Sequence, residues 1–174
     1  MKIILLFSVL LIGGVLGVAS CQTSRAGYES APYEVVRSDG KFEVRDYPAM
    51  TVVETTMVGE NGDGSFRRLF GFITGRNANK EKIAMTTPVF MAGSDTGRTM
   101  AFVMPAKMKM GDVPQPADVS VVVRDIAAGR FAVLSFSGGR SDEREEESLG
   151  HLETWIAKEG FQSSVSPIYG YFDP

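Results

Sequence analysis

Two stretches of this chain repeat each other and decide its fold. Residues 42–59 read FEVRDYPAMTVVETTMVG, and residues 121–138 read VVVRDIAAGRFAVLSFSG. At an offset of 79 they align without a gap, and Val-Arg-Asp, one Ala and one Gly coincide. The same offset places TPVF at 87–90 over SPIY at 166–169. Two repeats are too few for a solenoid, so we expect them to combine into one pseudo-symmetric domain.

Each repeat predicts a strand, a turn, a strand, a helix and a further strand. In the first repeat, residues 42–47 and 49–58 are rich in Val, Thr and aromatic residues, which are typical of strands, and Pro48 marks the bend. A helix follows before Gly75, because apolar residues recur at the spacing of one helix face: Phe66, Leu69, Phe70 and Ile73.

Two further features belong to these predicted helices. Gly71 inside the first helix costs about 1 kcal/mol relative to Ala, so we expect a ligand or a strand to approach closely there. The second helix begins near Asp142, ends at Gly160 and carries one apolar face, made of Leu149, Leu152 and Ile156. Its acidic start is interpreted as helix stabilisation rather than a cation site, with Asp142 and Glu145 spaced like a capping box.

The composition excludes several classes of protein. The chain has 174 residues, 18 Lys and Arg against 21 Asp and Glu, and a net charge of -3, which argues against a nucleic-acid partner. One Cys excludes an intramolecular disulfide framework and a Cys-cluster metal site. One His excludes haem ligation by a pair of His residues within a monomer.

The N-terminus is predicted to be an export signal. Lys2 precedes the apolar run IILLFSVLLIGGVLGV at residues 3–18, and Ala19, Ser20 and Cys21 follow it. A basic residue, a short apolar run and small residues before a cleavage point are typical of a secretory leader rather than of a transmembrane helix. The sequence VASC at 18–21 resembles a bacterial lipobox, in which the Cys is lipid-modified and becomes the first mature residue.

We therefore expect residues 1–20 to be a lipoprotein signal peptide and Cys21 to carry the lipid. Several acyl chains, at about 0.8 kcal/mol per buried methylene, would hold the protein on a membrane of the cell envelope. Gln22 stands where Asp would resemble an inner-membrane retention signal, which favours the outer membrane, facing the periplasm. Residues 21–32 are predicted to be a tether, and residues 33–174 one domain with halves of about 33–112 and 113–174.

Four motifs resemble the SOUL haem-binding family in order and spacing. The central one is KIAMTTPV at 82–89. The others are YEVV at 33–36 with FEVR at 42–45, GFITG at 71–75 and YGYFDP at 169–174. The resemblance implies an α+β fold: a distorted antiparallel β-barrel with two flanking helices, built from two pseudo-symmetric strand-strand-helix-strand halves.

The resemblance also implies a ligand and a place for it. In this family a tetrapyrrole is held in a hydrophobic surface cleft along the first helix, whose apolar positions fall on Phe66 and Phe70. Flat apolar rings suit a macrocycle, and Arg67 and Arg68 would meet the propionates of non-covalently bound haem. The alternative for Phe66, Phe70 and Ile73 is that they pack the helix on the sheet.

His151 and the Met residues offer other interpretations. His151 could ligate iron axially, but a partly exposed structural role is favoured, since no motif places a ligand there. Six Met residues could bind Cu(I) or fill an irregular core: Met85, Met91, Met100, Met104, Met108 and Met110.

The sequence thus predicts a haem- or porphyrin-binding protein rather than an enzyme. No catalytic triad order or nucleophile-elbow pattern surrounds the single His. Such a protein would buffer or transfer its ligand. The alternatives are a binding protein for another amphipathic small molecule, Met-based copper binding and a hydrolase.

Overall fold

The repeated stretches form strands that pair with each other across the two halves of the chain. A computed structural model describes residues 2–7, 27–57, 64–93, 97–139, 141–164 and 166–172. The first repeat supplies β4 (Phe42–Tyr47) and β5 (Met50–Thr56), and the second supplies β9 (Val121–Ile126) and β10 (Gly129–Phe136). β4 pairs with β10, and β5 pairs with β9, both antiparallel. The bend at Pro48 therefore carries the chain from one strand pair to the other.

Most of the remaining strands complete one large sheet. Its order is β3-β4-β10-β1-β11-β7-β8-β5-β9, and all its pairings are antiparallel. The further strands of this sheet are β1 (Lys2–Phe7), β3 (Glu34–Asp39), β7 (Val89–Ala92), β8 (Thr99–Val103) and β11 (Ile168–Tyr171). A small parallel sheet joins β2 (Glu29–Ser30) to β6 (Thr86–Thr87), and one 3-10 turn spans Met110–Asp112.

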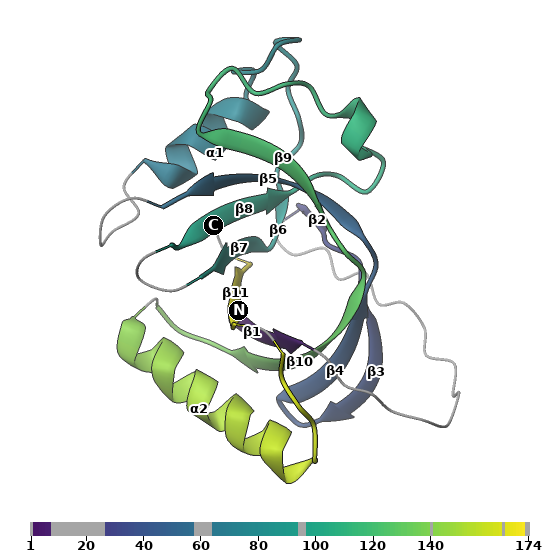
Figure 1. Ribbon diagram of the computed structural model, residues 1–174, viewed down its shortest axis with the longest axis vertical. Coiled ribbons are helices and arrows are strands. Elements are labelled where there is room, and N and C mark those ends of the chain that lie inside the picture. The colour runs from purple at the N-terminus through teal and green to yellow at the C-terminus, as the bar shows by residue number, and fades with distance from the viewer. Residues whose placement is uncertain are drawn as a thin grey trace.

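The large sheet is strongly curved and carries both helices on its outside. Figure 1 shows α1 (Ser65–Ile73) over β5 and β8, and α2 (Asp142–Lys158) along β10 on the opposite side of the molecule. Within the described residues no pairing joins the two outermost strands, β3 and β9, so the sheet is not closed by hydrogen bonds. The predicted α+β class with two flanking helices is confirmed at this level.

Three apolar clusters hold these layers together. Alternate strand residues point to opposite faces, so Val52 lies in the cluster inside the curved sheet while Val53 lies under α1. Likewise Val133 faces the inside, and Leu134 packs under α2 with Leu152 and Trp155. The inside of the curve and both helix contacts are therefore apolar.

The two helices depart from the predicted details. In α1 the buried apolar residues are Leu69, Phe72 and Ile73, whereas Phe66 and Phe70 are exposed, so the predicted apolar face is wrong for these two. In α2 the N-cap is Ser141, whose hydroxyl accepts from the Arg144 amide at 3.2 Å. The predicted capping box is therefore wrong. Glu145 is instead buried and accepts a hydrogen bond from the Tyr171 hydroxyl at 2.5 Å.

The N-terminal segment has a place in the sheet. Lys2–Phe7 forms β1 between β10 and β11. Residues 8–26, including Cys21, lie outside the described residues, so the leader, the lipid attachment and most of the tether stay predictions. In the described part of the chain no helix is long and apolar enough to cross a membrane.

Candidate functional site

Two neighbouring phenylalanine side chains, Phe66 and Phe70, form an exposed aromatic pair on the outer surface of α1. We call this pair the aromatic step. The rings of Phe66 and Phe70 stack with centroids 5.9 Å apart and an interplanar angle of 14°. Phe66 also meets the buried Phe102 of β8 edge to face at 5.3 Å. Phe66 keeps 39% of its surface exposed and Phe70 keeps 46%. Helical spacing of four residues places the two rings on one face of α1, where both keep part of their surface exposed.

The family-like motif at 82–89 lies beneath this helix and fixes it. The Ile83 amide donates to the carbonyl of Ile73 at 2.8 Å, and the Ile83 side chain is buried in the cluster under α1. Asn77, also buried, donates from Nδ2 to the Phe72 carbonyl at 2.9 Å. Thr86 donates to the Val103 carbonyl at 2.6 Å. Within this motif Ile83 therefore holds the end of α1, while Thr86 binds β8.

The two predicted arginines of α1 have different surroundings. Arg68 donates to Thr55 Oγ1 at 3.1 Å, to the Thr56 carbonyl at 2.7 Å and to Ser65 Oγ at 3.2 Å. These bonds tie α1 to the end of β5. Arg67 is exposed, and no described residue forms an ion pair or hydrogen bond with its side chain. Of the two, Arg67 is the cation available to a ligand.

Gly71 is approached by a side chain of the same chain. A Cβ built on Gly71 would lie 2.9 Å from Cδ of Arg76, so the close neighbour within the chain is a side chain and not a strand. Arg76 thus adds a second exposed cation beside α1. Nearby, hydrogen bonds from Ser120 hold the pKa of Asp118 below its usual range, and Arg68 and Arg76 add to this effect.

The beginning of α1 lacks both a side-chain cap and an acidic residue in its first turn. Its N-cap is Gly64 at φ 83°, which offers no side-chain cap, and its first turn contains no acidic residue. Amide groups at a helix N-terminus carry partial positive charge, and Arg67 adds a full charge. The described part of this end of α1 therefore carries positive charge.

The Met residues mostly fill the core under α1. Met100 and Met104 are buried there, and Met85, Met91 and Met108 pack against the same cluster, whereas Met110 is 42% exposed. These positions agree with Met as a filler of irregular apolar space. The structure also supplies no group of three or more His, Cys, Asp or Glu residues suited to a metal ion within its described part.

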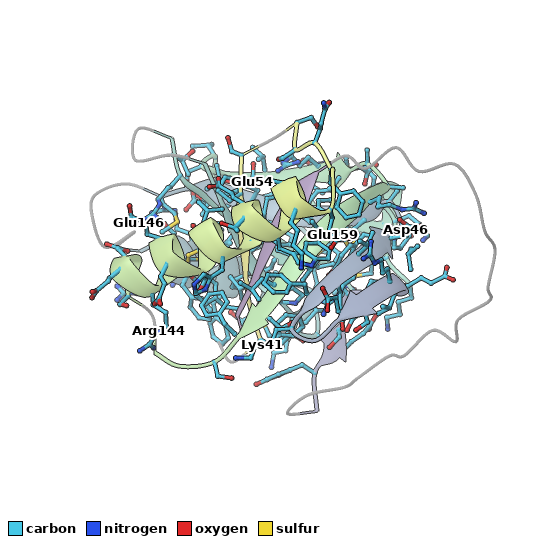
Figure 2. All side chains as sticks on the ribbon, turned by 90° about the horizontal axis from the view of Figure 1, so that it is seen from below. Lys41, Asp46, Glu54, Arg144, Glu146 and Glu159 are labelled. Atoms are coloured by element: carbon cyan, nitrogen blue, oxygen red, sulfur yellow. The ribbon has the colours of Figure 1, made fainter. Side chains whose placement is uncertain are left out.

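His151 lies apart from the aromatic step. It is exposed on α2 and lines a polar hollow of about 660 Å³, counting space open to solvent, with Lys41, Ser137, Arg144 and Glu147. Figure 2 shows Lys41 and Arg144 on the same side of α2. Since α1 and α2 lie on opposite sides of the molecule, the structure does not bring His151 to Phe66 and Phe70.

A second hollow lies inside the curved sheet and was not foreseen from the sequence. It is narrow, with about 40 Å³ of free space, and mainly apolar, with Met50, Phe90 and Phe131 in its wall. Arg124 also lines it and is paired with Glu54, to which it donates from Nε at 3.0 Å and from Nη2 at 2.5 Å. The Val-Arg-Asp repeat was the available signal, because Arg124 is the second copy of Arg45.

Arg45 is buried in a cluster of its own. Its Nε donates to the Glu43 carboxylate at 2.5 Å, and its Nη1 donates to the Tyr47 hydroxyl at 3.3 Å. Its guanidinium carbon, Cζ, lies 4.1 Å from the centre of the Tyr33 ring. Burial raises the pKa of Tyr47, and Arg45 offsets only part of that effect. Burial alone lowers the pKa of Arg45, but Tyr47, Tyr33 and Glu43 together raise it above its usual value. This cluster is a satisfied internal charge rather than an open site.

Comparison with known proteins places this chain among haem-binding relatives. A family model described as "SOUL heme-binding protein" matches residues 28–174. Heme-binding protein 2 of Mus musculus is 28% identical over 157 residues, which cover 83% of this chain and 76% of the mouse protein. Heme-binding protein 2 of Homo sapiens gives the same identity and coverage.

Proposed function

Because the chain belongs to the SOUL haem-binding protein family, we propose that it binds haem or another tetrapyrrole on the aromatic step of α1. The observation that carries this proposal is the stacked, half-exposed pair Phe66 and Phe70. A flat macrocycle laid on these rings would exclude water from both, and aromatic contacts contribute about 0.5–1.5 kcal/mol beyond area burial. Phe102 supports the step from below and limits how far Phe66 can turn.

The charged periphery of the ligand would be met at the beginning of α1. Haem carries two carboxylates, and the uncapped helix N-terminus with Arg67 provides positive charge for them. Arg68 would act by holding the helix to β5, since its donors already serve Thr55, Thr56 and Ser65. Arg67 would therefore contact the ligand, and Arg68 would position the helix.

The residues present fit non-covalent capture of the macrocycle. Phe side chains do not coordinate iron, and His151 lies on the other helix, beside a polar hollow. Haem would bring iron chemistry of its own when bound, while the chain supplies apolar contact and charge. We propose binding for buffering or transfer, without catalysis.

The domain and its location complete the proposal. We propose that residues 33–174 form a pseudo-symmetric, barrel-like domain: adding 79 to the bounds of β4 and β7 gives those of β9 and β11, which supports it. We also propose that residues 1–20 are an export leader and that Cys21 anchors the protein to the outer membrane, facing the periplasm. The sequence motif supports this location. Mass spectrometry of the envelope-extracted protein would find Cys21 acylated and N-terminal.

A second candidate is an amphipathic small molecule in the hollow inside the sheet. Its apolar wall and the Arg124–Glu54 pair favour a ligand with an apolar body and one polar end. This site and the aromatic step lie on opposite faces of the sheet, so substitutions distinguish them.

Titration of the protein with haem tests the proposal. We expect a saturable absorption change that weakens at least about tenfold, about 1.4 kcal/mol, in Phe70→Asp. Val36→Asp is the matched control, because Val36 on β3 is exposed and apolar, and β3 lies away from α1 (Figure 1). If haem binds with equal affinity to the unchanged protein, to Phe70→Asp and to the control variant, the aromatic step is not the haem site. If no saturable binding occurs, the proposed function is wrong.

A further inference from the structure

β1 takes a central position in the large sheet although it comes from the far N-terminus. It pairs antiparallel with β10 along six residues, Lys2↔Phe136 to Phe7↔Phe131, and with β11 along four, Lys2↔Tyr171 to Leu5↔Ile168. Both long edges of the segment are thus hydrogen-bonded. Neighbouring strands lie about 4.8 Å apart, so without β1 the strands β10 and β11 would face each other across about 10 Å.

The strand order shows what this position requires. Reading inward from β4 gives β4-β10-β1-β11, and reading inward from β9 gives β9-β5-β8-β7. The offset of 79 relates β4 to β9, β5 to β10 and β7 to β11. β1 therefore stands where β8 stands in the other half. There, β8 is joined to its neighbours by hydrogen bonds on both sides.

The surroundings of the position are apolar on both faces of the sheet. On the inner face, Val133 and Ile168 lie in register with position 5 and belong to the inner cluster or pack against it. On the outer face, Leu134 and Tyr169 lie in register with position 4 and belong to the cluster under α2 or pack against it. A strand placed between two such apolar surfaces requires a continuous apolar sequence, and residues 3–7 read IILLF.

We infer that the gap between β10 and β11 is a binding site for an extended apolar peptide strand, whose resident ligand in the full chain is Lys2–Phe7. The recognition is β-strand addition: backbone groups of β10 and β11 give affinity, and the two apolar faces select the sequence. If the proposed leader is cleaved, the resident strand is no longer joined to the domain and can be exchanged for another strand. Processing at Cys21 would then make this a strand-exchange site beside the membrane. The inference does not depend on haem binding.

An exchange experiment tests the site without relying on natural processing. A protease site is placed between residues 8 and 26 of the full chain, and the folded protein is cut. We expect the N-terminal fragment to stay bound and to be displaced, saturably, by a fluorescent peptide of residues 1–8. The same peptide with Leu5→Pro should bind at least about tenfold more weakly, since Pro removes a ladder donor. Leu5→Ile is the matched control and should bind like the original.

Hydrogen exchange in the uncut chain gives an independent result. Leu5→Pro should accelerate amide exchange in β10 and β11, whereas Val15→Pro, outside the strand, should leave it unchanged. Loss of the fragment after cutting, no peptide binding and unchanged protection of β10 and β11 in Leu5→Pro would overturn the inference. In that case β10 and β11 do not need a strand between them.

Discussion

The ring of Phe66 lies between Phe70 and Phe102, stacked on the first at 5.9 Å and edge to face with the second at 5.3 Å. The exposed pair is thereby connected to the cluster under α1, which also contains Leu69 and Ile73. An aromatic surface held in this way is preorganised, because Phe66 is restrained by the core before any ligand arrives. The two rings therefore have different expected effects on stability.

Replacing each ring by Ala should separate folding from binding. Phe66→Ala removes the contact with Phe102 and should lower the free energy of unfolding by about 1–2 kcal/mol. Phe70→Ala should cost less than about 1 kcal/mol, because Phe70 is more exposed. Both should weaken haem binding by similar factors. Chemical denaturation and haem titration measure the two effects, and a Phe70→Ala protein with unchanged haem affinity would contradict the assignment.

The two arginines of α1 should behave in opposite ways. Arg67→Ala should weaken haem binding, more so at low salt, and leave the free energy of unfolding nearly unchanged. Arg68→Ala should lower that free energy by about 1–2 kcal/mol, because Thr56 and Ser65 lose a charged donor. Thermal unfolding and titration at two ionic strengths check this pair. Equal loss of stability in both variants would show that Arg67 has a structural role as well.

His151→Ala should not change the absorption spectrum of the haem complex. His151 lies on α2 beside Lys41 and Arg144, away from the aromatic step. For the same reason metal-free protoporphyrin should bind within about fivefold of the haem affinity. A shifted Soret band in His151→Ala, together with much weaker porphyrin binding, would identify His151 as an iron ligand.

Stability at alkaline pH should depend on Tyr47. Burial raises the pKa of this phenol in the folded protein above its unfolded value of about 10. The contribution of Tyr47 to the free energy of unfolding is therefore complete below its unfolded pKa. It is lost as the pH rises through the higher pKa of the folded protein. The stability difference between the protein and Tyr47→Phe should be constant near pH 8 and shrink above about pH 10. Tyr28→Phe, at an exposed position, is the control. A difference that stays constant up to about pH 11 would contradict this effect.

Much of the fold could be predicted because its signals are local. Strand composition and the repeat predicted β4, β5, β9 and β10, and Gly75 and Gly160 follow the helix ends, both at positive φ. The partners of those strands could not be predicted, since pairing between β4 and β10 joins residues more than 80 apart. The place of Lys2–Phe7 in the sheet is non-local for the same reason.

The candidate site could be predicted in its residues but not in their orientation. α1 has apolar side chains at 66, 69, 70, 72 and 73, so more than one stripe satisfies helical spacing. The sheet selects the stripe of Leu69, Phe72 and Ile73, because these pack with Val53 and Ile83 in one buried cluster. The separate roles of Arg67 and Arg68 depend on which of them reaches Thr55, which spacing alone does not determine.

The most direct measurement of the central claim is an amide NMR spectrum of the full chain with bound ferric haem. The paramagnetic iron broadens signals of nearby amides. We expect broadening over Ser65–Ile73 and the adjacent part of β8, and sharp signals over Asp142–Lys158. Broadening centred on α2, or on strands that line the inner hollow, would contradict the account.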